Sequence, residues 1–323
     1  MSEPELIVRF TDEDAARELR ADARAGLTER PKWLSPKWFY DATGSELFER
    51  ITTLPEYYQT RAEQQVLQRH AMDVAETTGA ATLVELGSGS SEKTRLLLDA
   101  LHKHGTLRRF VPLDVSGSAL RAAVDAIALD YPELLVRGVV DDFTSGMAAL
   151  DAGPDRLVAF LGGTIGNLLP AERAGFFASV RAALRPGEWL LLGTDLVKDP
   201  DRLVRAYDDA LGVTAEFNRN VLRVLNRELG ADFVPEAFQH VALWNAEQEW
   251  IEMRLRAERP MRVRLAGLAL TAELAEGEEV RTEVSAKFRR ARVDDELAAA
   301  GFELQQWWLD DAGDFAVSLA VAR

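Results

Sequence analysis

The chain has 323 residues, of which 47% are hydrophobic and 28% are charged, and its formal net charge is -15. This length predicts about two domains with a large buried core. The acidic charge disfavours a nucleic-acid partner, because most of the surface would repel a phosphate backbone. The absence of cysteine excludes disulfides, thiolate metal sites and cysteine nucleophiles.

The N-terminal segment lacks a basic region followed by an apolar run, so we predict no signal peptide there. No stretch approaches the about 18 consecutive apolar residues that a membrane span requires. We therefore expect a cytoplasmic monomer without a membrane partner, acting on a small molecule. We also expect no metal site, because His102 and His104 are two residues apart on a predicted helix and do not share a face.

Short apolar strands alternate with helices between residues 82 and 197, after a first segment of about 60 residues without such alternation. This pattern is typical of a parallel sheet covered on both faces. We expect strands at 82–87, 109–115, 134–143, 156–163 and 189–197, and helices at 92–105, 117–130 and 171–184.

The pattern changes after residue 198. Two helices and three alternating segments typical of an antiparallel sheet follow, and the chain ends in a helix and a strand hairpin. We expect helices at 201–211, 214–229 and 293–301, and strands at 249–258, 261–270, 279–288, 302–309 and 314–322. We therefore predict a doubly wound α/β core with a terminal antiparallel hairpin, from residues 61–197 and 291–323. Residues 1–60 and 198–290 would form a second, α+β, substrate-binding domain.

Gly87 and Gly89 lie in VELGSGSS, where the first core strand meets its helix. Glycines there let the backbone turn tightly and approach a ligand, and the following helix N-terminus orients polar ligand groups. The third glycine of a dinucleotide fingerprint is missing near Ser91. A tight strand–helix turn without a ligand would also explain the two glycines.

Acidic residues end the next two predicted strands. Asp114 is placed to accept both hydroxyls of a ribose, or to cap the following helix. Asp142 is placed to accept from an adenine amino group, and Phe143 would cover the base or pack in the core. Open α/β sheets bind ligands at these carboxyl ends. Because no phosphate-binding loop accompanies them, the pattern favours S-adenosylmethionine (SAM) over NAD or ATP.

Segments along nearly the whole chain resemble the SAM-dependent histidine Nα-methyltransferases of ergothioneine biosynthesis. They include LVELGSGSSEKTRLLLDAL, FLGGTIGNL, RAYDDALGVTAEFNRNVL, WIEMRL, TEVSAKF and the N-terminal segment PKWFYDATGSELFERITTLPEYYQTR. The resemblance extends through residues 198–290, which unrelated methyltransferases would not share. It implies a Rossmann-like class I methyltransferase core. Gly163, where a small hydroxyl residue is expected, and Ala286, where a cysteine is expected, depart from the family's pattern.

The resemblance also implies two sets of site residues. The SAM site falls on Tyr57, Gly87, Lys93, Asp114, Asp142 and Phe143. The amino-acid site falls on Tyr57, Gly162, Asn167, Tyr207, Met253, Glu283 and Ser285, with Tyr40 and Phe48 among aromatic positions that line the same pocket.

These residue types suit histidine as a substrate. Asn167 and Tyr207 are uncharged donors for a carboxylate, although turn chemistry and helix packing would also explain them. Glu283 and Ser285 are two residues apart, so on a strand both point to one face and would hold the two ring nitrogens of an imidazole. An exposed sheet face would show the same spacing.

The aromatic positions suggest how the amine is handled. Tyr40 is our candidate for taking the proton of the amine, which must be neutral to attack. The rings of Tyr40, Phe48 and Tyr57 would tolerate the growing ammonium through cation–π contact, or would form a packed aromatic core.

The function that this resemblance implies is three successive methyl transfers to the α-amine of L-histidine, giving the trimethylated product hercynine. A methyltransferase for another aromatic amino acid such as tryptophan, distinguished at Met253 and Glu283, is the alternative within this class. A catalytically silent SAM-binding protein that regulates a partner, and a dehydrogenase, are the alternatives outside it. The missing third glycine and the terminal hairpin argue against the dehydrogenase.

Overall fold

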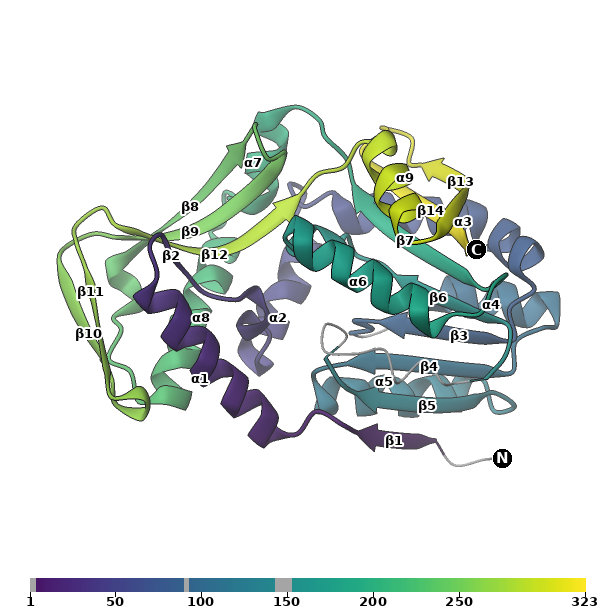
Figure 1. Cartoon of the computed structure of the whole chain (residues 1–323), viewed down its shortest axis with the longest axis horizontal. Coiled ribbons are helices and arrows are strands. Elements are labelled where there is room, and N and C mark those ends of the chain that lie inside the picture. Colours follow the sequence, from purple (N-terminus) through teal and green to yellow (C-terminus); the bar gives the residue numbers. More distant parts are fainter. Residues whose placement is uncertain (1–3, 90–92, 143–152) are drawn as a thin grey trace. The chain divides into compact units, whose positions relative to one another are not determined.

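The computed structural model describes residues 4–89, 93–142 and 153–323 (Figure 1). The chain forms two compact units. The first combines the segment that ends at Phe10 with Gln59–Val197 and Phe288–Arg323, and the second combines Thr11–Tyr58 with Lys198–Lys287. Among the described residues, no helix combines the length and the apolar character that crossing a membrane requires.

The first unit is built on one sheet. Its eight strands among the described residues follow the order β1-β5-β4-β3-β6-β7-β14-β13. Their bounds are β1 Glu5–Val8, β3 Thr82–Leu86, β4 Arg109–Asp114, β5 Leu135–Val140, β6 Arg156–Phe160, β7 Trp189–Asp195, β13 Phe302–Leu309 and β14 Phe315–Ala322. The pairs from β1 to β7 are parallel, whereas β14 pairs antiparallel with both β7 and β13. This confirms the predicted α/β core and its terminal hairpin.

Helices cover both faces of this sheet. They are α3 Gln59–Thr78, α4 Thr94–His104, α5 Gly117–Asp130, α6 Pro170–Ala183 and α9 Arg290–Ala299. Residues of α3, α4 and α5 share one buried apolar cluster with Ala159 and Leu161. Phe160 lies between those two and therefore points to the opposite face, where its ring lies 4.7 Å from Phe176 of α6. The sheet is thus doubly wound, as predicted.

The N-terminal strand β1 was absent from the predicted elements. It has four residues, ELIV, and pairs with β5 at the sheet edge. So short an edge strand shows no periodicity that a sequence pattern could reveal. Its pairing explains why the segment that ends at Phe10 lies with the first unit, although residues 1–60 were assigned to the second domain.

The second unit is an α+β structure. A four-stranded sheet has the order β2-β12-β9-β8, and β10 pairs with β11 in a separate hairpin. The strands are β2 Lys32–Trp33, β8 Phe238–Asn245, β9 Trp250–Ala257, β10 Met261–Leu265, β11 Leu270–Leu274 and β12 Glu279–Ala286. The helices are α1 Asp12–Thr28, α2 Ala42–Thr52, α7 Pro200–Tyr207 and α8 Val213–Leu229.

Two predicted elements of this unit were wrong in their bounds. The single strand expected at 261–270 is the hairpin β10–β11, because the chain turns at a short 3-10 helix and at Ala269, whose φ is +49°. The helix expected at 201–211 ends at Tyr207. The two carboxylate oxygens of Asp209 accept the N–H groups of Val213 and Thr214, which starts α8 instead of prolonging α7.

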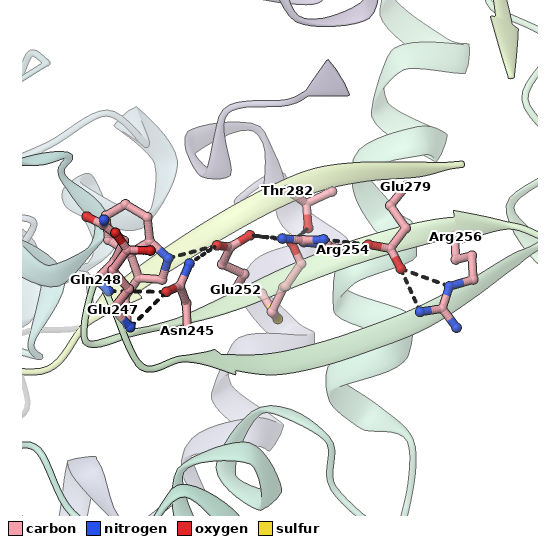
Figure 2. Close-up of polar contacts among 10 residues, drawn as sticks. Asn245, Glu247, Gln248, Glu252, Arg254, Arg256, Glu279 and Thr282 are labelled. Carbon is pink, nitrogen blue, oxygen red and sulfur yellow. Dashed lines mark hydrogen bonds and ion pairs between the residues drawn. The ribbon is translucent and has the colours of Figure 1, made fainter. Parts of the chain in front are cut away.

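The two faces of the four-stranded sheet differ sharply. Ile251, Met253 and Leu255 of β9 are buried in the apolar core. The alternate residues of β9 point to the other face and form a charged chain, which Figure 2 shows as Glu252–Arg254–Glu279–Arg256. Arg254 joins the two glutamates at 2.6 Å each. This chain links β9 to β12 and helps to fix their register.

Replacing Arg254 with methionine should lower the free energy of unfolding by about 1–2 kcal/mol. A fully buried pair would contribute more, but Arg254 is partly exposed and solvent screens its charge. Burial raises the pKa of Glu252 and of Glu279, but hydrogen bonds outweigh it and hold both below the usual 4.5. Carboxylates with lowered pKa values stabilise the fold above pH 4.5 and lose that contribution as the pH falls. The difference from wild type, measured by urea unfolding, should therefore shrink below pH 4.5.

The matched control for this measurement is Arg262→Met, which removes a solvent-exposed pair with Glu273 at 3.3 Å. It should change stability by less than about 0.5 kcal/mol. Equal effects of the two substitutions at pH 7 would contradict the stabilising role of the charged chain.

Candidate active site

In the first unit, the glycine turn after β3 lies beside the carboxyl end of β4. Gly87 and Gly89 have φ of +66° and +51°, a conformation that favours glycine. The N–H of Gly87 donates to the carbonyl of Leu113 at 2.9 Å. Among the described residues, which exclude 90–92, no atom lies within 4 Å of a Cβ added at either glycine.

Asp114 ties this turn to the next one. Its carboxylate accepts the N–H of Gly89 at 2.9 Å and the N–H of Ser116 at 2.9 Å. Burial raises the pKa of Asp114, and these backbone hydrogen bonds offset only part of the rise. Ser116 is itself the residue that precedes α5. The carboxylate therefore accepts one N–H from the glycine turn and one from the start of α5. A helix cap alone would explain only the second of these hydrogen bonds.

Asp142 follows the end of β5 by two residues and is only 4% exposed. The predicted strand 134–143 was slightly too long, because β5 ends at Val140. Phe143 lies outside the described residues. Asp114 and Asp142 nevertheless follow neighbouring parallel strands, as the sequence pattern required.

Glu63 of α3 is a buried carboxylate that connects two of the predicted site residues. It is 0% exposed, forms an ion pair with Lys93, and accepts the N–H of Gly162 at 2.7 Å. A Cβ on Gly193 of β7 would lie 2.1 Å from the Glu63 Oε1 atom. Gly193 is therefore the residue that makes room for this carboxylate.

The loop after β6 carries Gly162, Gly163 and Asn167. The two glycines have φ of +78° and +70°, and Asn167 ends a 3-10 helix that begins at Thr164. A hydroxyl residue at position 163 would be strained at this φ. This explains why glycine suits the loop where the family's pattern has another small residue.

In the second unit, the aromatic positions form one continuous series of ring contacts. The ring of Phe48 lies 5.5 Å from that of Tyr40 and 6.1 Å from that of Tyr57. The ring of Tyr57 lies 6.4 Å from that of Tyr207. Phe217 of α8, which the sequence analysis did not single out, packs against Tyr40 and Phe48 at 5.5 and 5.9 Å.

Glu283 and Ser285 lie on β12 and face the interior of the second unit. Glu283 is directly opposite Met253 of β9, and both side chains are buried. Ser285 is 5% exposed. The exposed sheet face considered as an alternative is therefore excluded. Burial raises the pKa of Glu283 to about 7, and the positive charge of Lys287 offsets part of that rise.

Lys287 adds a third group to this face of β12. Its ammonium lies 2.9 Å from the hydroxyl of Tyr207 and 2.9 Å from the hydroxyl of Ser285. The two hydroxyls lie 2.7 Å apart. Tyr207 of α7, Ser285 of β12 and Lys287 just after β12 thus form a closed polar triangle.

A second polar group fixes the end of α7. His240 of β8 lies 2.8 Å from the carbonyl oxygen of Tyr207 through Nε2 and 2.8 Å from the amide of Asn218 through Nδ1. Burial lowers the pKa of His240, which favours a neutral ring that donates at Nε2 and accepts at Nδ1. The Tyr207 backbone is therefore held independently of its hydroxyl.

Residues 19–322 match the family model described as histidine-specific methyltransferase, SAM-dependent. The chain belongs to this family of histidine-specific, SAM-dependent methyltransferases. The match extends over both compact units and includes the segment 198–287, which carries Glu283, Ser285 and Lys287.

Close relatives of this methyltransferase span almost the whole chain. It is 57% identical over 96% of both chains to a histidine N-alpha-methyltransferase from Mycolicibacterium smegmatis. It is likewise 57% identical over 94% of both chains to a histidine N-alpha-methyltransferase from Mycobacterium tuberculosis. A more distant relative, ergothioneine biosynthesis protein 1 from Neurospora crassa, is 34% identical over 62% of this chain and 23% of its own length.

The methyl donor of this methyltransferase is SAM, and the first unit has the features that such a ligand needs. Within the described part of the chain, no atom comes within 4 Å of a Cβ built at Gly87 or Gly89, and the Ser88 hydroxyl is buried with no hydrogen-bond partner. Asp114 stays predicted as the acceptor for ribose hydroxyls, and Lys93 as the partner of a ligand carboxylate.

Sequence reasoning missed Glu63, Phe217 and Lys287. Glu63 left a signal, since it shares the apolar side of α3 with Ala62, Val66 and Leu67, where a charged residue is unusual. Lys287 also left one, because it continues the two-residue spacing of Glu283 and Ser285. Phe217 left none, since an aromatic residue in an amphipathic helix usually belongs to the core.

Proposed function

We propose that this methyltransferase transfers methyl groups from SAM to the α-amine of L-histidine, three in succession, and so produces hercynine for ergothioneine biosynthesis. The observation that carries the proposal is the buried face of β12, where Glu283 lies opposite Met253 of β9 and Ser285 lies opposite Ile251. A carboxyl and a hydroxyl, both buried, suit a small ring with two polar nitrogens. A phenyl ring would leave the Glu283 carboxyl without a ligand partner, and an indole ring offers one nitrogen where the imidazole offers two.

The chain's own groups account for recognition and orientation. Tyr207 would donate its hydroxyl to the α-carboxylate, and Asn167 stays predicted as a further donor. Glu283 and Ser285 would hold the imidazole, and Gly162 and Met253 would border the substrate. When bound, SAM supplies an electrophilic methyl group for direct displacement by a neutral amine, so alignment supplies most of the rate enhancement.

The same proposal explains the aromatic residues. Tyr40, Phe48 and Tyr57 are partly buried and lie in one series of ring contacts. Their faces would accept the ammonium that forms as methyl groups accumulate. A cytoplasmic location and a monomeric state stay predictions.

The experiment that tests this proposal is tandem mass spectrometry of the product from histidine and SAM. It should find mono-, di- and trimethylated histidine with every methyl group on the α-nitrogen. Methylation of a ring nitrogen would contradict the orientation proposed for Glu283 and Ser285.

The role of Tyr40 has its own test. Tyr40→Phe keeps the ring contacts but removes the hydroxyl, so we expect kcat to fall by about 100-fold, the size of a lost acid–base group. The KM for histidine should change by less than about threefold, because the hydroxyl is assigned to the proton and not to binding. Stopped assays with labelled SAM measure both constants.

The control for Tyr40→Phe is Tyr131→Phe, which removes a hydroxyl that donates to Asp99 in the first unit. This control should leave kcat unchanged. If the Tyr40→Phe enzyme has the wild-type kcat, the Tyr40 hydroxyl does not take the proton of the amine.

A further inference from the structure

Lys287 is among the largest fully buried side chains of the second unit, with 0% exposure. It follows Ala286, the last residue of β12, and its ammonium also lies 4.7 Å from the centre of the Tyr207 ring. An ammonium group carries three donors and no acceptor. Both hydroxyl oxygens at 2.9 Å, those of Tyr207 and Ser285, therefore accept from Lys287.

The number of hydroxyl hydrogens then restricts what the triangle can do. Tyr207 and Ser285 lie 2.7 Å apart, so one hydroxyl donates to the other. Only one hydroxyl hydrogen is left to point out of the triangle. If it belongs to Tyr207, then Ser285 donates to Tyr207 and offers its remaining lone pair outward. If it belongs to Ser285, then Tyr207 donates inward and its hydroxyl cannot serve a carboxylate.

The charge of Lys287 favours the first arrangement when an anion is present. An ammonium that donates to a hydroxyl oxygen polarises its O–H bond, and of the two hydroxyls at 2.9 Å the phenol of Tyr207 is the more acidic and therefore the stronger donor. The positive charge is also 2.9 Å from the Tyr207 oxygen and is buried, where solvent screens it little. A carboxylate bound at Tyr207 would gain from both effects.

We propose that Lys287 is a positioning residue that directs the Tyr207 hydroxyl to the α-carboxylate of the amino-acid substrate and leaves Ser285 as an acceptor for a ring N–H. This inference rests on the proposed function, because it takes histidine as the occupant of this pocket. It couples the two ends of the substrate. When Tyr207 donates to the carboxylate, Ser285 can only accept a hydrogen bond from the substrate, so it pairs with the ring nitrogen that carries the hydrogen. Glu283 then faces the other nitrogen.

The test compares histidine with histamine, which has the same ring and amine but no carboxylate. Binding to Lys287→Met and to the wild type is measured by titration calorimetry with S-adenosylhomocysteine present. The substitution should weaken histidine binding by about 10- to 100-fold, the loss of a charge-assisted hydrogen bond. It should change histamine binding by less than about threefold. In a Tyr207→Phe background, Lys287→Met should weaken histidine binding by a smaller factor, because only the attraction of the charge itself is then lost.

Lys32→Met is the matched control. Lys32 is a second buried lysine of the same unit, ion-paired with Glu278. Its loss should lower the melting temperature and leave the histidine-to-histamine affinity ratio unchanged. If Lys287→Met does not fold, Lys287→Gln, which keeps an N–H donor without the charge, should show an intermediate loss for histidine only.

An equal loss for both ligands, or no loss for histidine, would overturn the inference. An undiminished effect of Lys287→Met on histidine binding in the Tyr207→Phe background would overturn it as well. A wild-type protein that methylates a different amino acid would refute the proposed function instead. The same comparison would then be made with that amino acid and its decarboxylated amine.

Discussion

Replacing Glu283 with glutamine should make the ligand-free protein more stable at pH 8 by about 3 kcal/mol, while leaving stability at pH 4 unchanged. Burial raises the pKa of this carboxyl from 4.5 to about 7. The folded state therefore holds the proton more tightly than the unfolded state does. As the pH rises from 4.5 to 7, the unfolded chain loses the proton first, so the wild type loses stability over that range. Glutamine has no proton to lose.

Urea unfolding of both proteins at several pH values measures this effect, with Glu276→Gln in an exposed turn as the control. The same Glu283→Gln enzyme should show a kcat/KM for histidine reduced by about 10- to 100-fold, because an ionisable partner of the ring is lost. A gain in stability without a loss of activity would mean that Glu283 is buried for a reason other than histidine binding. Parallel pH profiles of the two proteins would contradict the raised pKa.

Replacing Glu63 with alanine should lower the free energy of unfolding by about 3 kcal/mol, because it leaves Lys93 without its buried carboxylate partner. The N–H of Gly162 would also lose its acceptor. Since Lys93 is a predicted SAM-site residue, we expect SAM affinity to fall by at least about tenfold. Chemical unfolding and calorimetric titration with SAM measure the two effects separately.

Gly193→Ala tests the position of the Glu63 carboxylate without removing it. Its new Cβ would displace Glu63 Oε1 and should weaken SAM binding with Glu63 still present. Gly175→Ala in α6 is the matched control, because its Cβ would meet no atom of the described residues within 4 Å. It should leave SAM binding unchanged and stabilise the helix slightly. Wild-type SAM affinity in Glu63→Ala would show that Glu63 serves the fold alone.

The sequence predicted the parts of the site that depend on local pattern. The positions of Gly87, Asp114 and Asp142 at or just after strand ends were predictable, because the end of a buried strand is visible in hydropathy and parallel strands end at one edge. The spacing of Glu283 and Ser285 correctly placed them on one face, but periodicity cannot tell which face is buried. Burial comes from the apolar core that covers this face and includes Ile251 and Met253 of β9, and the register of β12 shifts between Arg281 and Glu283.

Other features depended on contacts between distant segments. Glu63 reaches Gly162, 99 positions away, and Lys287 reaches Tyr207, 80 positions away, so neither pair leaves a local pattern. The hairpin of β10 and β11 was interpreted as one strand because its turn includes Ala269 at positive φ, which alanine rarely adopts. The role of Phe143 stays a prediction.

The most direct test of this account is a competition assay in which the wild-type protein is given SAM and an equimolar mixture of the common amino acids, with products identified by mass spectrometry. The account predicts that histidine alone gains methyl groups, up to three on its α-nitrogen. Methylation of tryptophan or another amino acid in preference to histidine, or SAM binding without any methylation, would contradict it.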